Sequence, residues 1–176
     1  AYGNVIDAVT HPLQLFLNWL EALFVNTPWF IFLAVMVLIV YLTSRNMRIV
    51  AITVIGMLFI GFVGLWEDTM ITLAIVTVST LLAIVIGIPI GIMMARSDRA
   101  QSLVNPILDV MQTLPSFVYL IPVVMVFGIG KVPGVIAVVI YAVPPMIRLT
   151  NLGIRLVDRE VLEAADAFGS SPGQKL

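Results

Sequence analysis

Five long apolar segments, none of which carries an Asp, Glu, Lys, Arg or His, limit what this chain can fold into. They occupy residues 28–44, 49–66, 69–95, 114–130 and 132–147. A chain with 61% hydrophobic residues and a mean hydropathy of +1.12 needs lipid as its solvent. Inside a bilayer the backbone has to satisfy its own hydrogen bonds, and single apolar segments of this length do so as helices. The sequence therefore predicts an all-α integral membrane protein with about five transmembrane helices.

Two further segments are less apolar than these five. In residues 1–27 an apolar stripe at helical spacing faces a polar set. The stripe consists of Leu13, Phe16, Leu17, Leu20 and Phe24, and the polar set of Gln14, Asn18 and Glu21. This pattern predicts an amphipathic helix in the membrane interface, although a helix packed against neighbouring spans would show it too. Residues 100–113 are moderately apolar and predict a surface helix or an elbow before the fourth span.

The placement of arginine predicts the orientation. If every segment crosses, all seven arginines outside the spans fall in loops on one side: Arg45, Arg48, Arg96, Arg99, Arg148, Arg155 and Arg159. The opposite loops hold Glu67, Asp68 and Lys131. Because positive loops stay in the cytoplasm, the N-terminus is expected outside and the segment around residue 163 inside.

The sequence lacks the usual signs of catalysis. It has no cysteine, a single histidine (His11) and no glycine-rich phosphate loop followed by Lys-Ser, and we find no catalytic pair. The net charge of −1 gives no indication of nucleic-acid binding. Ion-coupled transporters often carry ionisable residues inside their spans, and this chain carries none there. We therefore expect a non-enzymatic chain, without a metal or cofactor of its own, that receives energy from another subunit.

Prolines and glycines mark the places where helices could break or approach one another. The candidate break positions along a translocation pathway are Pro89, Pro115, Pro122, Pro144 and Pro145. Such breaks would free backbone groups to face a pathway. The alternative is that proline is simply frequent in membrane helices. Around Pro89, Gly87 and Gly91 predict either a kink or a close approach of another helix.

A short polar segment near the C-terminus, between Asp158 and Gly169, predicts a helix with defined ends. Asp158 is placed to cap its start, and Gly169 is placed to end it in a left-handed conformation. One face carries Val161, Ala164, Ala165 and Phe168. After Gly169, Ser171 as a cap, Pro172 at the first helical position and Gln174 predict the start of a second helix.

Several motifs resemble one known family. Glu163-Ala164-Ala165, followed after three residues by Gly169, resembles the EAA motif of bacterial ABC importer permeases. The stretches 114–122, 127–133, 141–155 and 163–172 are similar to glycine betaine/proline betaine permeases of such importers. The resemblance covers about residues 65–176. It implies a type I importer fold in which Glu163, Ala164, Ala165, Phe168 and Gly169 form a coupling helix that docks on an ATPase.

The resemblance also implies partners and a location. We expect the permease subunit of an osmoprotectant importer in the bacterial inner membrane, with a second permease copy, two ATPases that bind ATP and Mg²⁺, and an external substrate-binding domain. The parts would be an interfacial helix (1–27), two transmembrane helices (28–66) and a partial permease core (67–176), truncated after the coupling loop. A permease for amino acids or another small solute, and a passive channel or membrane anchor, remain alternatives.

Overall fold

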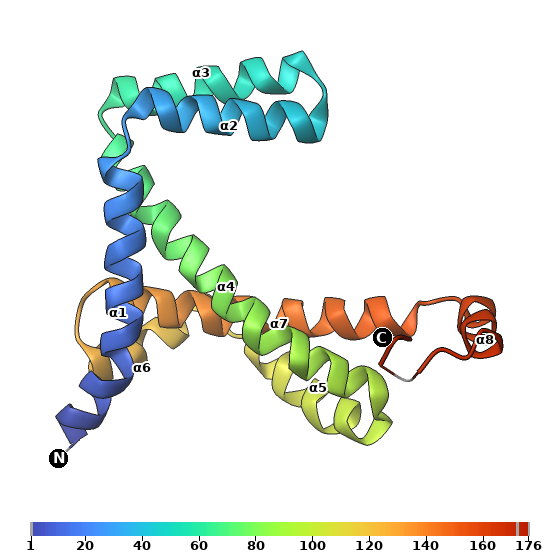
Figure 1. Ribbon diagram of the computed structural model, residues 1–176. Coiled ribbons are helices and arrows are strands. Elements are labelled where there is room, and N and C mark those ends of the chain that lie inside the picture. The colour runs from blue at the N-terminus through green and yellow to red at the C-terminus, as the bar shows by residue number, and fades with distance from the viewer. Residues whose placement is uncertain (1, 172, 176) are drawn as a thin grey trace. The chain divides into compact units, whose positions relative to one another are not determined.

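The computed structural model describes residues 2–171 and 173–175, and the regular structure in that part of the chain is helical. Figure 1 labels the elements in chain order. They are α1 (Tyr2–Asn26), α2 (Trp29–Ser44), α3 (Met47–Val63), α4 (Trp66–Arg96), α5 (Asp98–Thr113), α6 (Ser116–Phe127), α7 (Lys131–Arg155) and α8 (Arg159–Ala167). The chain forms two compact units, Ala1–Val78 and Ser79–Leu176, that divide within α4. Each is described by itself.

In the first unit, α2 and α3 form a helical hairpin (Figure 1). Arg45 adopts a left-handed conformation with φ of 47°, and its N–H donates to the Tyr41 carbonyl. Asn46 then caps α3, because its Oδ1 accepts from the Arg48 N–H at 2.9 Å. Two residues thus reverse the chain between two apolar helices. Neither helix has a buried residue, so both leave their side chains available to lipid or to other helices.

The N-terminal helix meets α2 at a sharp bend. The axes of residues 10–26 and of α2 differ by 99°, and together the two pieces are long and apolar enough to form one broken span. Phe24 and Phe32 pack edge to face across the bend, with ring centroids 6.0 Å apart. Of the predicted stripe, Leu17 and Leu20 are buried whereas Phe16 is exposed. The location of this helix in the membrane interface stays a prediction.

In the second unit, the C-terminal part of α4 packs closely against α7. A Cβ atom at Gly87 would lie 2.6 Å from Met146 Cγ, and one at Gly91 would lie 2.5 Å from Thr150 Cβ. Positions 87 and 91 therefore contact positions 146 and 150, so the two helices run in the same direction. Small residues four apart allow this contact between membrane helices. The close approach predicted for Gly87 and Gly91 is confirmed.

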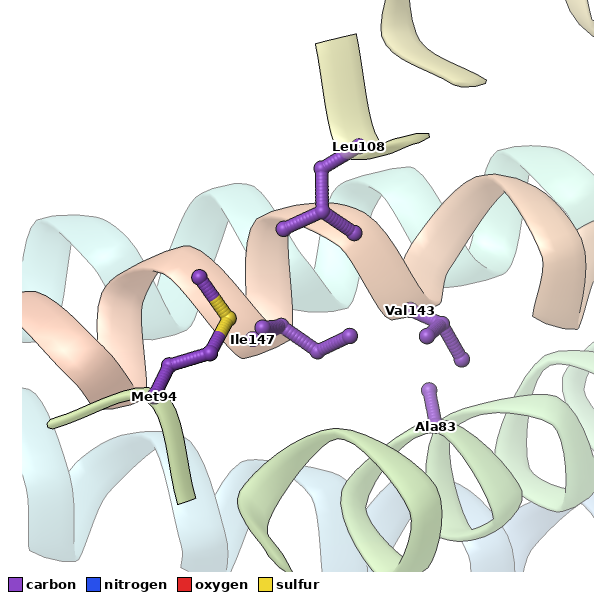
Figure 2. Close-up of a cluster of buried hydrophobic side chains, with 5 residues drawn as sticks. All are labelled: Ala83, Met94, Leu108, Val143 and Ile147. Carbon is purple, nitrogen blue, oxygen red and sulfur yellow. The ribbon is translucent and has the colours of Figure 1, made fainter. Parts of the chain in front are cut away.

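Helices α5 and α6 also pack against α7. Helices α5 and α6 meet at a 92° bend, where the Tyr119 hydroxyl donates to the Met111 carbonyl at 2.7 Å. Figure 2 shows buried side chains that converge from α4, α5 and α7. They are Ala83, Met94, Leu108, Val143 and Ile147. The predicted elbow at 100–113 is thus an amphipathic helix whose buried Leu108 joins the core.

The spans differ in length from the segments read in the sequence. Within the described residues, α4 (31 residues) and α7 (25 residues) are the single helices that are both long and apolar enough to cross a membrane, and each bent pair adds one more if it forms one span. Helix α6 has 12 residues, about 18 Å of rise, which is shorter than a hydrocarbon core of about 30 Å. The helix that contains the fifth predicted span continues past residue 147 to Arg155, and the place where it leaves the membrane stays a prediction.

Candidate coupling helix

Helix α8 begins where the sequence predicts. The Asp158 side chain accepts a hydrogen bond from the Glu160 N–H at 3.0 Å, and the helix runs from Arg159 to Ala167. The cap satisfies one of the N–H groups that have no partner in the first turn. Glu160 adds a negative charge close to the positive end of the helix dipole. The start of α8 is therefore fixed by local chemistry.

The end of α8 is closed by a Schellman motif. Gly169 has φ of 76°, its N–H donates to the Asp166 carbonyl at 2.9 Å, and the Ser170 N–H donates to the Ala165 carbonyl at 3.0 Å. These two bonds are the pair that defines the motif when a left-handed residue follows the helix. A Cβ on Gly169 would have no atom within 4 Å. Glycine is thus favoured here by its backbone conformation and not by crowding.

The chain beyond Gly169 folds back onto α8. Lys175 forms an ion pair with Asp166, and the Ser171 N–H donates to Gln174 Oε1 at 2.8 Å. This second bond is one half of the predicted capping box. Gly173 and Gln174 form a turn. Pro172, predicted at the first position of a new helix, lies outside the described residues.

The apolar face of α8 is open. Phe168 is 90% exposed and Val161 is 61% exposed, Ala164 is exposed and Ala165 is half-buried. No residue of α8 is buried. Glu163 pairs with Arg159 at 3.3 Å, but both side chains are largely in solvent, where such a pair contributes little to stability. The helix therefore presents apolar side chains that its own chain does not cover.

The C-terminal end of α7, just before α8, is fixed to two other helices by Arg155. Its Nη2 donates to the Met94 carbonyl at 2.9 Å and to Asp98 Oδ1 at 2.8 Å. Its Nε donates to Asn151 Oδ1 at 3.1 Å. Sequence reasoning assigned Arg155 only to the positive side of the membrane. Asn151 one turn before it was a signal, but the other two acceptors are distant in sequence.

A second ion pair joins α5 and α7. Arg148 of α7 pairs with Asp109 of α5. Along α5, Asp98 comes before Asp109. Along α7 their partners come in the opposite order, because Arg155 follows Arg148. Helices α5 and α7 are therefore antiparallel. Positions 11 apart on α5 and 7 apart on α7 each fall on about the same helical face. Both ion pairs thus lie along one interface between α5 and α7.

The candidate pathway prolines do not break the helices in which they lie. Pro89 lies inside α4, Pro122 inside α6, and Pro144 and Pro145 inside α7. Only Pro115 stands at a helix boundary, directly before α6. The helices continue through the other four positions, although each proline there removes one backbone donor. Whether any of them lines a pathway stays a prediction.

Comparison with known sequences assigns the second unit to a family. Residues 87–176 match the profile of the binding-protein-dependent transport system inner membrane component. The chain belongs to this family of membrane permeases. The match begins at the Gly87 contact between α4 and α7 and includes α5, α6, α7 and α8. The helices that fix Arg155 and the candidate coupling helix α8 therefore both fall within it.

Three relatives from different bacteria align with 99% of the chain. It is 49% identical to the glycine betaine/carnitine transport permease protein GbuB of Listeria monocytogenes and 45% identical to the glycine betaine/proline betaine transport system permease protein ProW of Escherichia coli. It is 39% identical to the glycine betaine transport system permease protein OpuAB of Bacillus subtilis. The chain spans 59%, 49% and 62% of their lengths. The similarity also includes the first sixty residues, which appear less diagnostic in the sequence alone.

Proposed function

We propose that this chain is the membrane permease subunit of an ATP-driven importer for glycine betaine or a related methylated ammonium compound. Membership of the permease family supports the transport role. The substrate class rests on the three relatives, each of which is named for glycine betaine transport. Proline betaine and carnitine, which also occur in those names, are the closest alternatives within the same chemistry. We place the protein in the bacterial inner membrane with its N-terminus outside and α8 in the cytoplasm.

One observation carries the coupling role: α8 is capped at both ends by adjacent residues and exposes Val161 and Phe168, which no other part of residues 2–171 and 173–175 covers. A short helix with an open apolar face suits docking into a groove on another protein. The segment also carries the Glu163-Ala164-Ala165 and Gly169 pattern. The small side chains of Ala164 and Ala165 allow a partner to approach closely. We assign this docking role to Glu163, Ala164, Ala165, Phe168 and Gly169.

The partner on α8 is an ATPase subunit, which brings ATP and Mg²⁺. Two ATPases act on two copies of the permease, and their closure on ATP moves the α8 helices toward each other. This displacement switches the pathway from inward-facing to outward-facing. An external substrate-binding domain delivers the substrate and supplies most of the selectivity. In this scheme the chain itself catalyses no reaction.

The pathway between the permease copies includes the proline-bearing helices. Pro144 and Pro145 lack the N–H groups that would bond to the carbonyls of Ile140 and Tyr141, four residues earlier in α7. Such carbonyls are polar groups at membrane depth, and they can face water or substrate in a pathway. We propose this role first for Pro144 and Pro145, and then for Pro89, Pro115 and Pro122.

The test uses cells that lack their own betaine uptake and express the complete transporter containing this chain. We expect uptake of radiolabelled glycine betaine under hyperosmotic stress, and we expect Glu163→Lys to abolish most of it at an unchanged membrane level of the protein. Arg159→Gln is the matched control, because it removes the same exposed ion pair but leaves the Glu163 carboxylate in place. If Glu163→Lys transports like the control, α8 does not couple to the ATPase. If the unaltered transporter takes up no betaine, the substrate assignment is wrong.

A further inference from the structure

We propose that Arg155 is a positioning residue that fastens the base of α8 to the junction of α4 and α5, so that a displacement of α8 is transmitted to all three longer helices. This inference rests on the coupling role proposed for α8. It assigns to one side chain the mechanical link between the helix that docks on a partner and the helices that cross the membrane.

The contacts of Arg155 span both sides of a chain turn. The Met94 carbonyl is one of the last in α4, and Asp98 is the first residue of α5. The Met94 carbonyl also accepts a longer bond from the Ser97 N–H, at 3.4 Å, and carbonyls at a helix C-terminus attract a positive charge. A single guanidinium nitrogen that binds both acceptors therefore holds the end of one helix to the start of the next. Lysine cannot reproduce this planar arrangement.

The guanidinium is also oriented from its own helix. Asn151 is only 7% exposed and accepts from the Arg155 Nε. With Nε held in this way, Nη2 is directed at the α4–α5 junction. Besides Ser79, Asn151 is the one polar residue classed as buried among those whose exposure the structure describes. Burial of an amide is tolerated where its hydrogen bonds are made, which fits a structural role in placing Arg155.

The helices next to Arg155 have little freedom to slide. About two turns before Arg155 in α7, the Ile147 carbonyl oxygen would lie 2.9 Å from a Cβ at Gly91 of α4. Helices α4 and α7 are therefore already in backbone contact there. The Arg148–Asp109 pair provides the second tie between α5 and α7. Packed interfaces of this kind shift as units and do not deform continuously. One rigid body is therefore formed by helix α5 together with the C-terminal ends of α4 and α7. A three-residue connection joins α8 to this body.

Arg159 provides a matched contrast. It lies four residues after Arg155, carries the same charge, and pairs only with Glu163 of its own helix. The Arg159 side chain is 91% exposed, whereas that of Arg155 is 33% exposed. Loss of Arg159 removes a positive charge from this end of the unit but breaks no contact between helices. Comparison of variants at Arg155 and Arg159 thus distinguishes the loss of a positive charge from the loss of contacts between helices.

The experiment measures how many glycine betaine molecules enter per ATP hydrolysed by the complete transporter in proteoliposomes. We expect Arg155→Gln to lower this ratio by about tenfold, within the usual range of coupling between two sites. ATP hydrolysis itself should persist, because α8 and its cap are unchanged. Arg155→Lys should recover part of the ratio, and Arg159→Gln should leave it unaltered. A purely structural role would reduce protein yield or melting temperature without changing the ratio.

Asp98→Asn is a second test of the same link, which remains informative if the Arg155→Gln protein does not fold. The Asp98 side chain is 88% exposed, so its replacement weakens the link without leaving a buried charge. A lowered ratio in Asp98→Asn, with no further loss in the double variant, supports the link. An unchanged ratio in both Asp98→Asn and Arg155→Lys overturns it. The unaltered transporter is measured before any variant. If it shows no betaine-dependent ATP hydrolysis, the proposed function is wrong, and this outcome is distinct from a failure of the Arg155 link.

Discussion

The contact of Gly91 with α7 gives the most quantitative prediction. Replacing Gly91 by alanine places a methyl carbon 2.5 Å from Thr150 Cβ, 2.8 Å from Thr150 Cγ2 and 2.9 Å from the Ile147 carbonyl oxygen. All three distances are far below van der Waals contact. The Cβ of Thr150 is fixed to its backbone, and the third atom belongs to the backbone itself. The helices have to separate to admit the methyl group.

The expected loss of stability follows from two opposing effects. Overpacking of a well-packed interface costs about 1–3 kcal/mol. Glycine to alanine in a helix interior gains about 1 kcal/mol in helix propensity. Because the close contacts at Gly91 include a carbonyl oxygen, we take the upper part of the first range, which leaves a net destabilisation of about 1–2 kcal/mol. Gly91→Leu should exceed this value, since the larger side chain has no space at all.

The assay is thermal unfolding of the purified protein in one detergent, with two further alanine variants. At Gly87 the new methyl would lie 2.6 Å from Met146 Cγ and 2.8 Å from Met146 Cβ, but the nearest backbone atom is 3.5 Å away, against 2.9 Å at Gly91. Gly87→Ala should therefore cost less than Gly91→Ala. At Gly153, also within a helix, nothing lies within 4 Å. Gly153→Ala should therefore be neutral or stabilising by up to about 1 kcal/mol. The predicted order of melting temperatures is Gly153→Ala, then Gly87→Ala, then Gly91→Ala.

A different order would refute the reasoning. If Gly91→Ala melts at or above the temperature of Gly153→Ala, α4 and α7 are not in backbone contact at this position. The rigid body that Arg155 is proposed to fasten would then lose its main support. A fall in all three variants would instead indicate that α4 and α7 require glycine for a reason other than crowding.

Three further predictions concern α8 and the topology. Asp158→Ala removes the cap and should destabilise α8 by about 1 kcal/mol, which hydrogen exchange would record as roughly fivefold faster opening of its first-turn amides; unchanged exchange would contradict the cap. Gly169→Val should cost about 1–2 kcal/mol through its left-handed conformation and lower betaine uptake at a normal membrane level, and uptake equal to wild type would remove this turn from the mechanism. Single cysteines at Asp68 and Asp158, placed in a chain without native cysteine, should react with an impermeant reagent from outside and from inside, respectively; labelling of both from one side would overturn the orientation.

Local features were predictable from the sequence because their partners are close in the chain. Asp158 caps its own helix through a bond to the residue two positions later. Gly169 and Ser170 end that helix through bonds to residues three and five positions earlier, respectively. The spacing of Gly87 and Gly91 indicated a position where another helix could approach closely. In each case the residue type acts on the neighbouring backbone or on any helix that approaches, so knowledge of the partner was unnecessary.

Features that depend on distant partners could not be predicted in this way. Arg155 binds Met94 and Asp98, which lie 61 and 57 residues earlier, and no pattern within α7 identifies them. The continuation of α7 through Pro144 and Pro145 also depends on its surroundings. Pro144 is buried, and packing by neighbouring helices compensates in membrane proteins for the hydrogen bonds that proline removes. The sequence shows where a helix is weakened, whereas tertiary packing decides whether it breaks.

We propose that ATP, through α8, drives glycine betaine across the membrane. The most direct measurement is accumulation of radiolabelled glycine betaine in proteoliposomes that contain the complete transporter, with ATP on the side of its ATPases. With ATP, we expect glycine betaine to accumulate against its concentration gradient. We expect no accumulation with a non-hydrolysable ATP analogue or with the Glu163→Lys variant. Equilibration of betaine without ATP would indicate a passive channel and would contradict the account.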